Sequence, residues 1–121
     1  MKISRLKISS NFFLAPMSGI SDYPYREVVK EFKPGLVFSE MIASRALIEK
    51  SKKTLKMIKK DSNEISAIQI AGCDPDIMAE AAIICEGNGS DLVDINMGCP
   101  VKKVVNGYAG SALMKNEVLA L

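Results

Sequence analysis

Four short apolar runs recur along the chain, and each is separated from the next by a segment long enough for a helix. The runs cover residues 12–15, 36–38, 65–70 and 92–95. They are almost continuously apolar, as in strands that are covered on both faces of a sheet. Strands that alternate with helices form parallel β/α units with right-handed crossovers. The pattern therefore predicts an α/β protein built on a parallel sheet.

The segments between these runs carry the signals of helices. Asp22 or the serine before it is an N-cap candidate, because a proline and apolar residues at helical spacing follow. Residues 43–59 predict a second helical region in two pieces around Ser51. Asp74-Pro75, a cap followed by proline at the first helical position, starts a third helix. Residues 111–121 again have helical character, which gives about four β/α units.

Two arrangements of parallel β/α units fit this alternation, an open doubly wound sheet and part of a (β/α)8 barrel. The first strand is not followed by the Gly-x-Gly-x-x-Gly loop typical of dinucleotide-binding sheets. Each strand instead ends in polar or sulfur groups, and in a barrel the functional residues come from such strand ends in turn. A complete barrel has about 250 residues. We therefore expect a partial TIM (β/α)8 barrel in this single domain of 121 residues.

Composition and charge narrow the classes of protein that fit. The chain has 48% apolar and 25% charged residues, the balance of a soluble globular protein, and a formal net charge of only +2. Lysines cluster between Lys50 and Lys60, where a solvated helix face is favoured over contact with RNA phosphates. The apolar run at residues 12–17 is too short to span a bilayer. We expect a cytoplasmic protein with no membrane partner.

Cysteine and histidine usage limits the chemistry. The spacings of Cys73, Cys85 and Cys99 match no zinc pattern, and an odd count without a secretory signal argues against a disulfide framework. Histidine, the commonest general acid/base and metal ligand, is absent. No metal site is predicted. Any catalysis must use Cys, Lys, Asp, Glu or Tyr.

Cys99 stands out because it lies between Gly98 and Pro100, directly after the fourth apolar run. Glycine and proline force a turn there, so the thiol is placed at the end of a strand, above the sheet. A free thiol has a pKa of about 8.5, so it is mostly protonated at neutral pH and can donate a proton. A small buried residue at a tight turn is the alternative. Spacing alone leaves both interpretations open.

Five motifs in register resemble the tRNA-dihydrouridine synthases. They are Leu14–Asp22, Ser39-Glu40-Met41, Gln69–Gly72, Asp94–Pro100, and Lys103-Val104 with Gly110–Met114. The resemblance implies an FMN-containing (β/α)8 barrel with a separate helical domain, an oxidoreductase that uses NADPH to reduce uridines of tRNA. On this basis residues 1–121 are the N-terminal half of the barrel domain. Its C-terminal half and the helical tRNA-binding domain are absent.

The resemblance also implies roles for individual residues. It assigns flavin contacts to Ala15-Pro16-Met17 and to Gln69, and the approach to the target base to Asn96. It assigns the catalytic acid to Cys99, which would protonate C5 of uracil after hydride reaches C6. Lys102 and Lys103 follow Cys99 where the tRNA backbone would have to pass, so we expect one of them, with Lys103 as the candidate, to contact RNA.

Plainer alternatives stand beside these assignments. Gln69 could cap the next helix, and Met17 could be ordinary core. Cys85 lies among alanine and isoleucine on a helix face, so we expect it to pack there. Cys73 could lie near the mouth of the site, but a structural role is favoured.

Competing functions stay open at this point. A flavin-barrel enzyme acting on a free pyrimidine fits the fold, but the Asn-x-Gly-Cys-Pro arrangement speaks against it. The other alternative is a truncated remnant, or one half of a split enzyme, without activity alone. Barrel phosphate sites frequently follow the seventh and eighth strands, so we expect this half to bind FMN poorly. Its unpaired edges invite a complementary C-terminal fragment or self-association.

Overall fold

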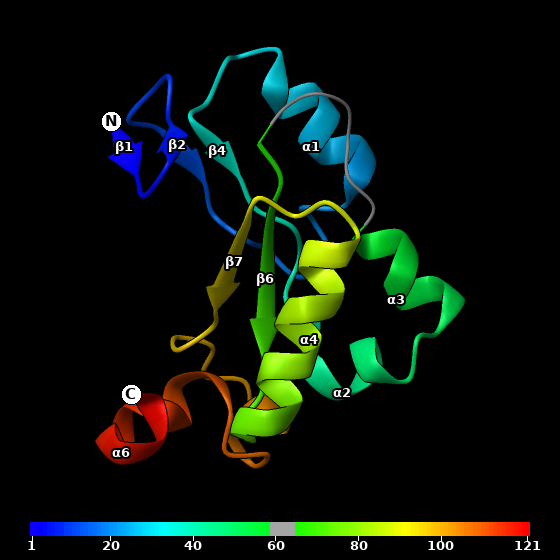
Figure 1. The fold of residues 1–121 in the computed structure, drawn as a ribbon, viewed down its shortest axis with the longest axis vertical. Helices are drawn as coiled ribbons and strands as arrows, with labels where there is room; N and C mark the ends of the chain where they lie inside the picture. The colour runs from blue at the N-terminus through cyan, green and yellow to red at the C-terminus, as the bar shows by residue number, and fades with distance from the viewer. Residues whose placement is uncertain (59–64) are drawn as a thin grey trace.

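The computed structural model describes residues 1–58 and 65–121 as a mixed α/β structure (Figure 1). The strands are β1 (Lys2–Ile3), β2 (Leu6–Lys7), β3 (Phe13–Leu14), β4 (Leu36–Val37), β5 (Ile42–Ala43), β6 (Ala67–Ala71) and β7 (Leu92–Ile95). The helices are α1 (Tyr23–Lys30), α2 (Ser44–Ile48), α3 (Lys52–Met57), α4 (Pro75–Gly87), α5 (Lys102–Val105), the 3₁₀ helix η1 (Gly110–Lys115) and α6 (Glu117–Ala120).

The strands that carry the fold pair in parallel. β3 pairs with β4, and β5, β6 and β7 form a second sheet in that order. A parallel bridge between Phe38 and Ala67 connects the end of β4 to the start of β6. Neighbours in the sheets are therefore neighbours along the chain. The predicted parallel α/β architecture is confirmed, with β3 shorter than the predicted run at residues 12–15.

The segment between β4 and β5 keeps contact with β6 through a side chain. Ser39 is buried, and its amide donates to the carbonyl oxygen of Ala67 at 3.0 Å. Its hydroxyl accepts from the amide of Gln69 at 3.1 Å. A hydroxyl thus takes the place of a backbone carbonyl between β4, which lies in a predicted run, and β5, which was not predicted.

Asp22, a predicted cap, accepts from the amide of Tyr25 at 3.1 Å at the start of α1. Ser51, predicted only as the break between two helical pieces, is also a cap, because it accepts from the amide of Thr54 at 3.1 Å at the start of α3. Asp74 caps α4. The second helical region is divided into α2 and α3 around Ser51, as predicted, and its last residue, like Lys60, lies outside the described residues. No helix in the described ranges has the length and apolar character that crossing a bilayer requires.

Some short elements were not predicted. The N-terminal hairpin of β1 and β2 has two residues per strand, which is too few for a periodic signal. Helix α5 is a single turn directly after the Cys99 loop. The predicted helical segment at residues 111–121 consists of η1 followed by α6.

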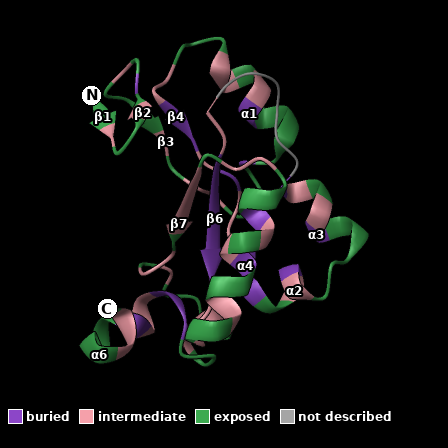
Figure 2. Cartoon of the chain, in the orientation of Figure 1, coloured by how far each residue is buried: buried purple, intermediate pink, exposed green. Residues whose placement is uncertain are grey.

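The main core lies where α2 and α4 pack against β5 and β6, and Figure 2 shows β6 buried along its length. Its buried members are Ile42, Leu47, Ile58, Ile68, Ile70, Ala81 and Cys85. Cys85 has no exposed surface, and burial raises the pKa of its thiol to about 11. The prediction that Cys85 packs on a helix face is confirmed.

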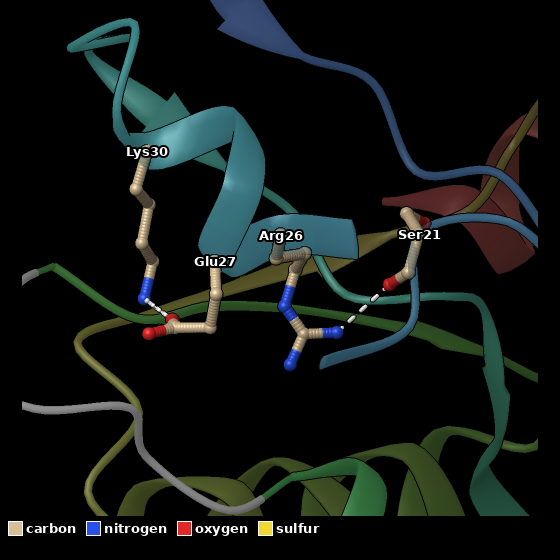
Figure 3. Close-up of polar contacts among 4 residues, drawn as sticks. All are labelled: Ser21, Arg26, Glu27 and Lys30. Atoms are coloured by element: carbon tan, nitrogen blue, oxygen red, sulfur yellow. Dashed lines mark hydrogen bonds and ion pairs between the residues drawn. The ribbon is translucent and has the colours of Figure 1, made fainter. Parts of the chain in front are cut away.

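Helix α1 buries a charged residue instead of its apolar stripe. Arg26 is 6% exposed, and its Nη1 donates to the carbonyl oxygen of Ser21 at 2.8 Å (Figure 3). On the same helix Lys30 pairs with Glu27 at 2.7 Å. Val28 is 57% exposed, and Phe32, just beyond the helix, is 82% exposed. The face of α1 that the periodicity predicts as apolar is therefore uncovered in the described part of the chain.

Candidate active site

Loops that follow successive parallel strands meet around one hollow of about 450 Å³. β6 and β7 point to the same end of the molecule, near α6 in Figure 1. The hollow is lined by Pro16, Ser18, Met41, Gln69, Asn96, Met97, Gly98, Cys99 and Val101. Four residues singled out from the sequence, Pro16, Gln69, Asn96 and Cys99, thus come together. None of these lining residues, all within the described ranges, is charged.

The segment Ala15-Pro16-Met17 contributes one of its three residues to this hollow. Pro16 lines it, whereas Ala15 and Met17 lie beside Pro16 in the chain and are not among the lining residues. The backbone of Met17 is fixed by Ser21, whose hydroxyl accepts from the Met17 amide at 2.8 Å and donates to its carbonyl oxygen at 3.0 Å. Ser21 is fully buried. The loop after β3 is therefore a fixed turn that presents Pro16.

Glu40 joins two of the loops. Its Oε1 accepts from the amide of Gly19 at 2.5 Å, which connects the loop after β3 to the segment after β4. Gly19 has a φ of +77°, a conformation that favours glycine. The motif Ser39-Glu40-Met41 stands out in the sequence, but the sequence predicts no role for its residues. The structure shows that Ser39 and Glu40 hold backbone, and that Met41 lines the hollow.

A chain of side-chain hydrogen bonds includes two residues that line the hollow, Gln69 and Asn96. Gln69 and Asp94 are directly paired positions on β6 and β7, and Gln69 Nε2 donates to Asp94 Oδ2 at 2.6 Å. Asn96 Nδ2 donates to Gln69 Oε1 at 2.9 Å. Asn96 Oδ1 accepts from the amides of Gly98 at 3.3 Å and Cys99 at 3.0 Å. Asp94 is thereby connected to the cysteine loop.

Asp94 was missed as a site residue when the sequence was considered alone. The available signal was a carboxylate in the middle of the apolar run Leu92–Ile95, where an apolar residue is the expected choice. The partner could not be read from the sequence, because it depends on the register between β6 and β7.

The Cys99 loop is held from both sides. Its amide donates to Asn96, and its carbonyl oxygen accepts from the amide of Ser111 at 3.0 Å. Gly110 has a φ of +62°, and a Cβ built there would lie 2.6 Å from the Cys99 carbonyl oxygen. The Cys99 side chain is a half-buried free thiol at the edge of the hollow. This arrangement can present a proton donor and an amide to one bound molecule.

A second hollow of about 690 Å³ adjoins the first, and Ser18, Met41, Cys99 and Val101 line both. Lys103, Arg45 and Cys73 line only the second. Lys103 is therefore near Cys99 but outside the hollow that holds Gln69. Cys73 and Cys99 line this second hollow together. Cys73 therefore lies near the mouth of the candidate site, the alternative to the structural role that the sequence favoured.

In the described ranges, no group of three or more Cys, Asp or Glu side chains could hold a metal ion.

A model of the family described as dihydrouridine synthase matches residues 13–121, which include every residue of both hollows. The chain belongs to the dihydrouridine synthase family.

Individual dihydrouridine synthases are similar over nearly the whole chain. A probable tRNA-dihydrouridine synthase of Rickettsia conorii is 52% identical over 122 residues, covering 99% of this chain and 37% of the relative. tRNA-dihydrouridine synthase B of Pasteurella multocida is 46% identical over 118 residues, covering 95% of this chain and 35% of the relative. The chain spans a little over one third of the length of these curated relatives.

Proposed function

We propose that this chain is the N-terminal part of the catalytic domain of a tRNA-dihydrouridine synthase, which uses FMN and NADPH to reduce the C5–C6 bond of uridine in tRNA. The observation that carries the proposal is the hollow that brings together Pro16, Gln69, Asn96 and Cys99 at the strand ends. Membership of the family supports the reaction, and the geometry supports the roles of the residues.

The proposed domain is a partial TIM barrel. Its support is the order of the parallel strands, which follows the chain from β3 to β7 in the described residues. A doubly wound sheet reverses its order at a switch point, whereas a barrel does not. Functional groups at successive strand ends fit a barrel as well.

The lining of the first hollow suits the ring system of a flavin better than its phosphate. Pro16, Met41 and Met97 offer apolar surface, and the Gln69 amide offers hydrogen bonds to a ring edge, the mixture expected of a cofactor pocket. No cation among the described residues lines this hollow. Pro16 and Gln69 would hold the ring, with Ala15 and Met17 shaping the turn beside it.

Cys99 is the proposed general acid. A flavin held by Pro16 and Gln69 would supply the hydride for C6 of the uracil. The Cys99 thiol would give its proton to C5, where negative charge develops, and would regain a proton from water. The two backbone hydrogen bonds at Cys99 keep this thiol at the edge of the hollow. Asn96 is the side chain proposed to meet the base.

The substrate RNA is proposed to run along the second hollow. Lys103 and Arg45 are exposed and line it beside Cys99. Contacts of this kind with phosphates dominate affinity for nucleic acid. The lysines of α3 are also exposed, but none of them lines either hollow.

A second candidate is a chain that has no activity alone. The first hollow supports it, since no cation among the described residues lines that hollow, and so does the share of the relatives' length that the chain covers. A complementary fragment or a second copy would then have to complete the site.

A chimera tests the proposed function. This chain replaces the matching segment of the Rickettsia conorii relative, and the purified chimera is incubated with NADPH and unmodified tRNA. Dihydrouridine measured by mass spectrometry is expected to form. A chimera that folds, binds flavin and forms no dihydrouridine contradicts the proposal.

A further inference from the structure

We propose that Asp94 is a positioning residue for Cys99, and that it acts through the side chains of Gln69 and Asn96. This inference rests on the proposed function, in which Cys99 gives a proton to the base. The three contacts join Asp94 to Gln69 at 2.6 Å, Gln69 to Asn96 at 2.9 Å and Asn96 to the Cys99 amide at 3.0 Å.

The two ends of this hydrogen-bond chain fix its direction. An ionised carboxylate can only accept, and a backbone N–H can only donate. Gln69 and Asn96 lie between them, and each amide has one donor end and one acceptor end. Reversing either amide would set two donors or two acceptors face to face. A single orientation of both amides therefore satisfies all three contacts.

At the Asp94 end of the hydrogen-bond chain, the position of Gln69 is fixed by burial and by a backbone contact. Gln69 is 6% exposed, and its backbone amide is fixed by the buried hydroxyl of Ser39. A hydrogen bond to a charged oxygen is about twice as strong as one between neutral groups. The carboxylate thus sets the orientation of Gln69, and Gln69 sets that of Asn96.

The Cys99 end is where the orientation matters. With its Nδ2 turned to Gln69, Asn96 directs Oδ1 at the amides of Gly98 and Cys99. Ser111 fixes the opposite side of Cys99. The same orientation leaves the second Nδ2 hydrogen of Asn96 for a carbonyl oxygen of the base, so one carboxylate aligns both groups that meet the substrate.

Two substitutions of Asp94 with nearly equal shape separate the possible roles. Asp94→Asn keeps an acceptor oxygen, and Asp94→Leu removes it. Both are made in a Cys73→Ser background, so that Cys99 is the accessible thiol. Hydrogen exchange of the Cys99 amide is followed by NMR, and alkylation of Cys99 by iodoacetamide is followed by mass spectrometry. Neither readout needs flavin or tRNA, so failure here is distinguishable from failure of the proposed function.

We expect Asp94→Leu to speed exchange of the Cys99 amide about tenfold, the effect of losing one hydrogen bond, and to speed alkylation of Cys99 as well. Asp94→Asn should stay within about threefold of the parent on both readouts. Equal effects of the two variants would mean that the charge acts through space and would overturn the proposal. Unchanged exchange in both would overturn it as well.

Gln69→Leu cuts the same hydrogen-bond chain at its centre and serves if Asp94→Leu fails to fold. It should match the effect of Asp94→Leu, and the double variant should show no further increase. Slow alkylation of the buried Cys85 verifies that each variant is folded. Independent, additive effects at positions 69 and 94 would contradict transmission through Gln69.

Discussion

Gly110 allows the backbone to pass close to Cys99, on the side opposite the Asn96 side chain that holds the Cys99 amide. Its φ of +62° and the nearness of the Cys99 carbonyl leave no room for a Cβ, which would also lie 3.2 Å from the Cys99 Cβ. The Ser111 amide can reach Cys99 only because the chain passes this closely. At the scale of single residues, the site thus depends on a backbone contact beyond Cys99 itself.

Gly110→Ala is therefore expected to lower the free energy of unfolding by about 1 to 3 kcal/mol, because it adds both strain and a steric clash. Urea unfolding measures this change. Gly87→Ala is the matched control, since a Cβ at Gly87 meets nothing within 4 Å. It should leave stability unchanged or raise it by up to about 1 kcal/mol. Equal stability of the two variants would contradict the close approach.

Asp94, Gln69 and Asn96 show how far residue-level prediction reaches. Gln69, Asn96 and Cys99 stand out because each lies near the end of an apolar run, and the family resemblance assigns their roles. Their mutual hydrogen bonds were not found, because they depend on the pairing of Gln69 with Asp94 across two strands. The sequence alone contains no measure of that register.

Helix α4 packs against α2 and against β6 and β7 of the sheet, and it contributes buried residues to the main core. Cys85 lies on its buried face and has no exposed surface. Burial raises the pKa of the Cys85 thiol from 9.0 to about 11, because the charged thiolate is poorly solvated there. The folded state consequently favours the neutral thiol more strongly than the unfolded state does.

This difference makes the packing of α4 sensitive to alkaline pH. The contribution to stability is complete below pH 9.0 and is lost as the pH rises towards about 11. Between pH 8 and 10.5 the parent should lose about 2 kcal/mol more than Cys85→Ala does. Urea unfolding at the two pH values checks it. Equal losses in both proteins would contradict the raised pKa.

The elements themselves were predictable where the local signals were strong. Asp22 and Asp74 begin helices as predicted caps, and β6 and β7 overlap their predicted runs. The break between β4 and β5 was not predictable, since it depends on a hydroxyl that replaces a carbonyl. The apolar spacing of α1 was misleading, because Arg26 is buried on that helix instead.

The described residues present the proposed site together with uncovered apolar surface. Phe12 is 81% exposed beside β3, and Phe32 is exposed just beyond α1. The hollow proposed for the flavin has apolar and amide lining, and no cation among the described residues lines it. This lining suits the ring of FMN better than its phosphate.

The isolated chain is accordingly expected to bind FMN weakly. After mixing with FMN and gel filtration, the visible spectrum of the protein peak should show far less than one flavin per chain. The Rickettsia conorii chimera, treated in the same way, is the positive control. A yellow isolated chain with stoichiometric flavin would contradict the incomplete phosphate site.

Substitutions in the chimera test whether Cys99 delivers the proton to the base. Cys99→Ala and Cys73→Ala are compared in the chimera by the dihydrouridine that each forms in tRNA, with flavin content verified. Loss of a general acid lowers rates by about 10² to 10⁴, so Cys99→Ala should lose at least about a hundredfold while Cys73→Ala stays close to the parent. An undiminished rate for Cys99→Ala would contradict the account.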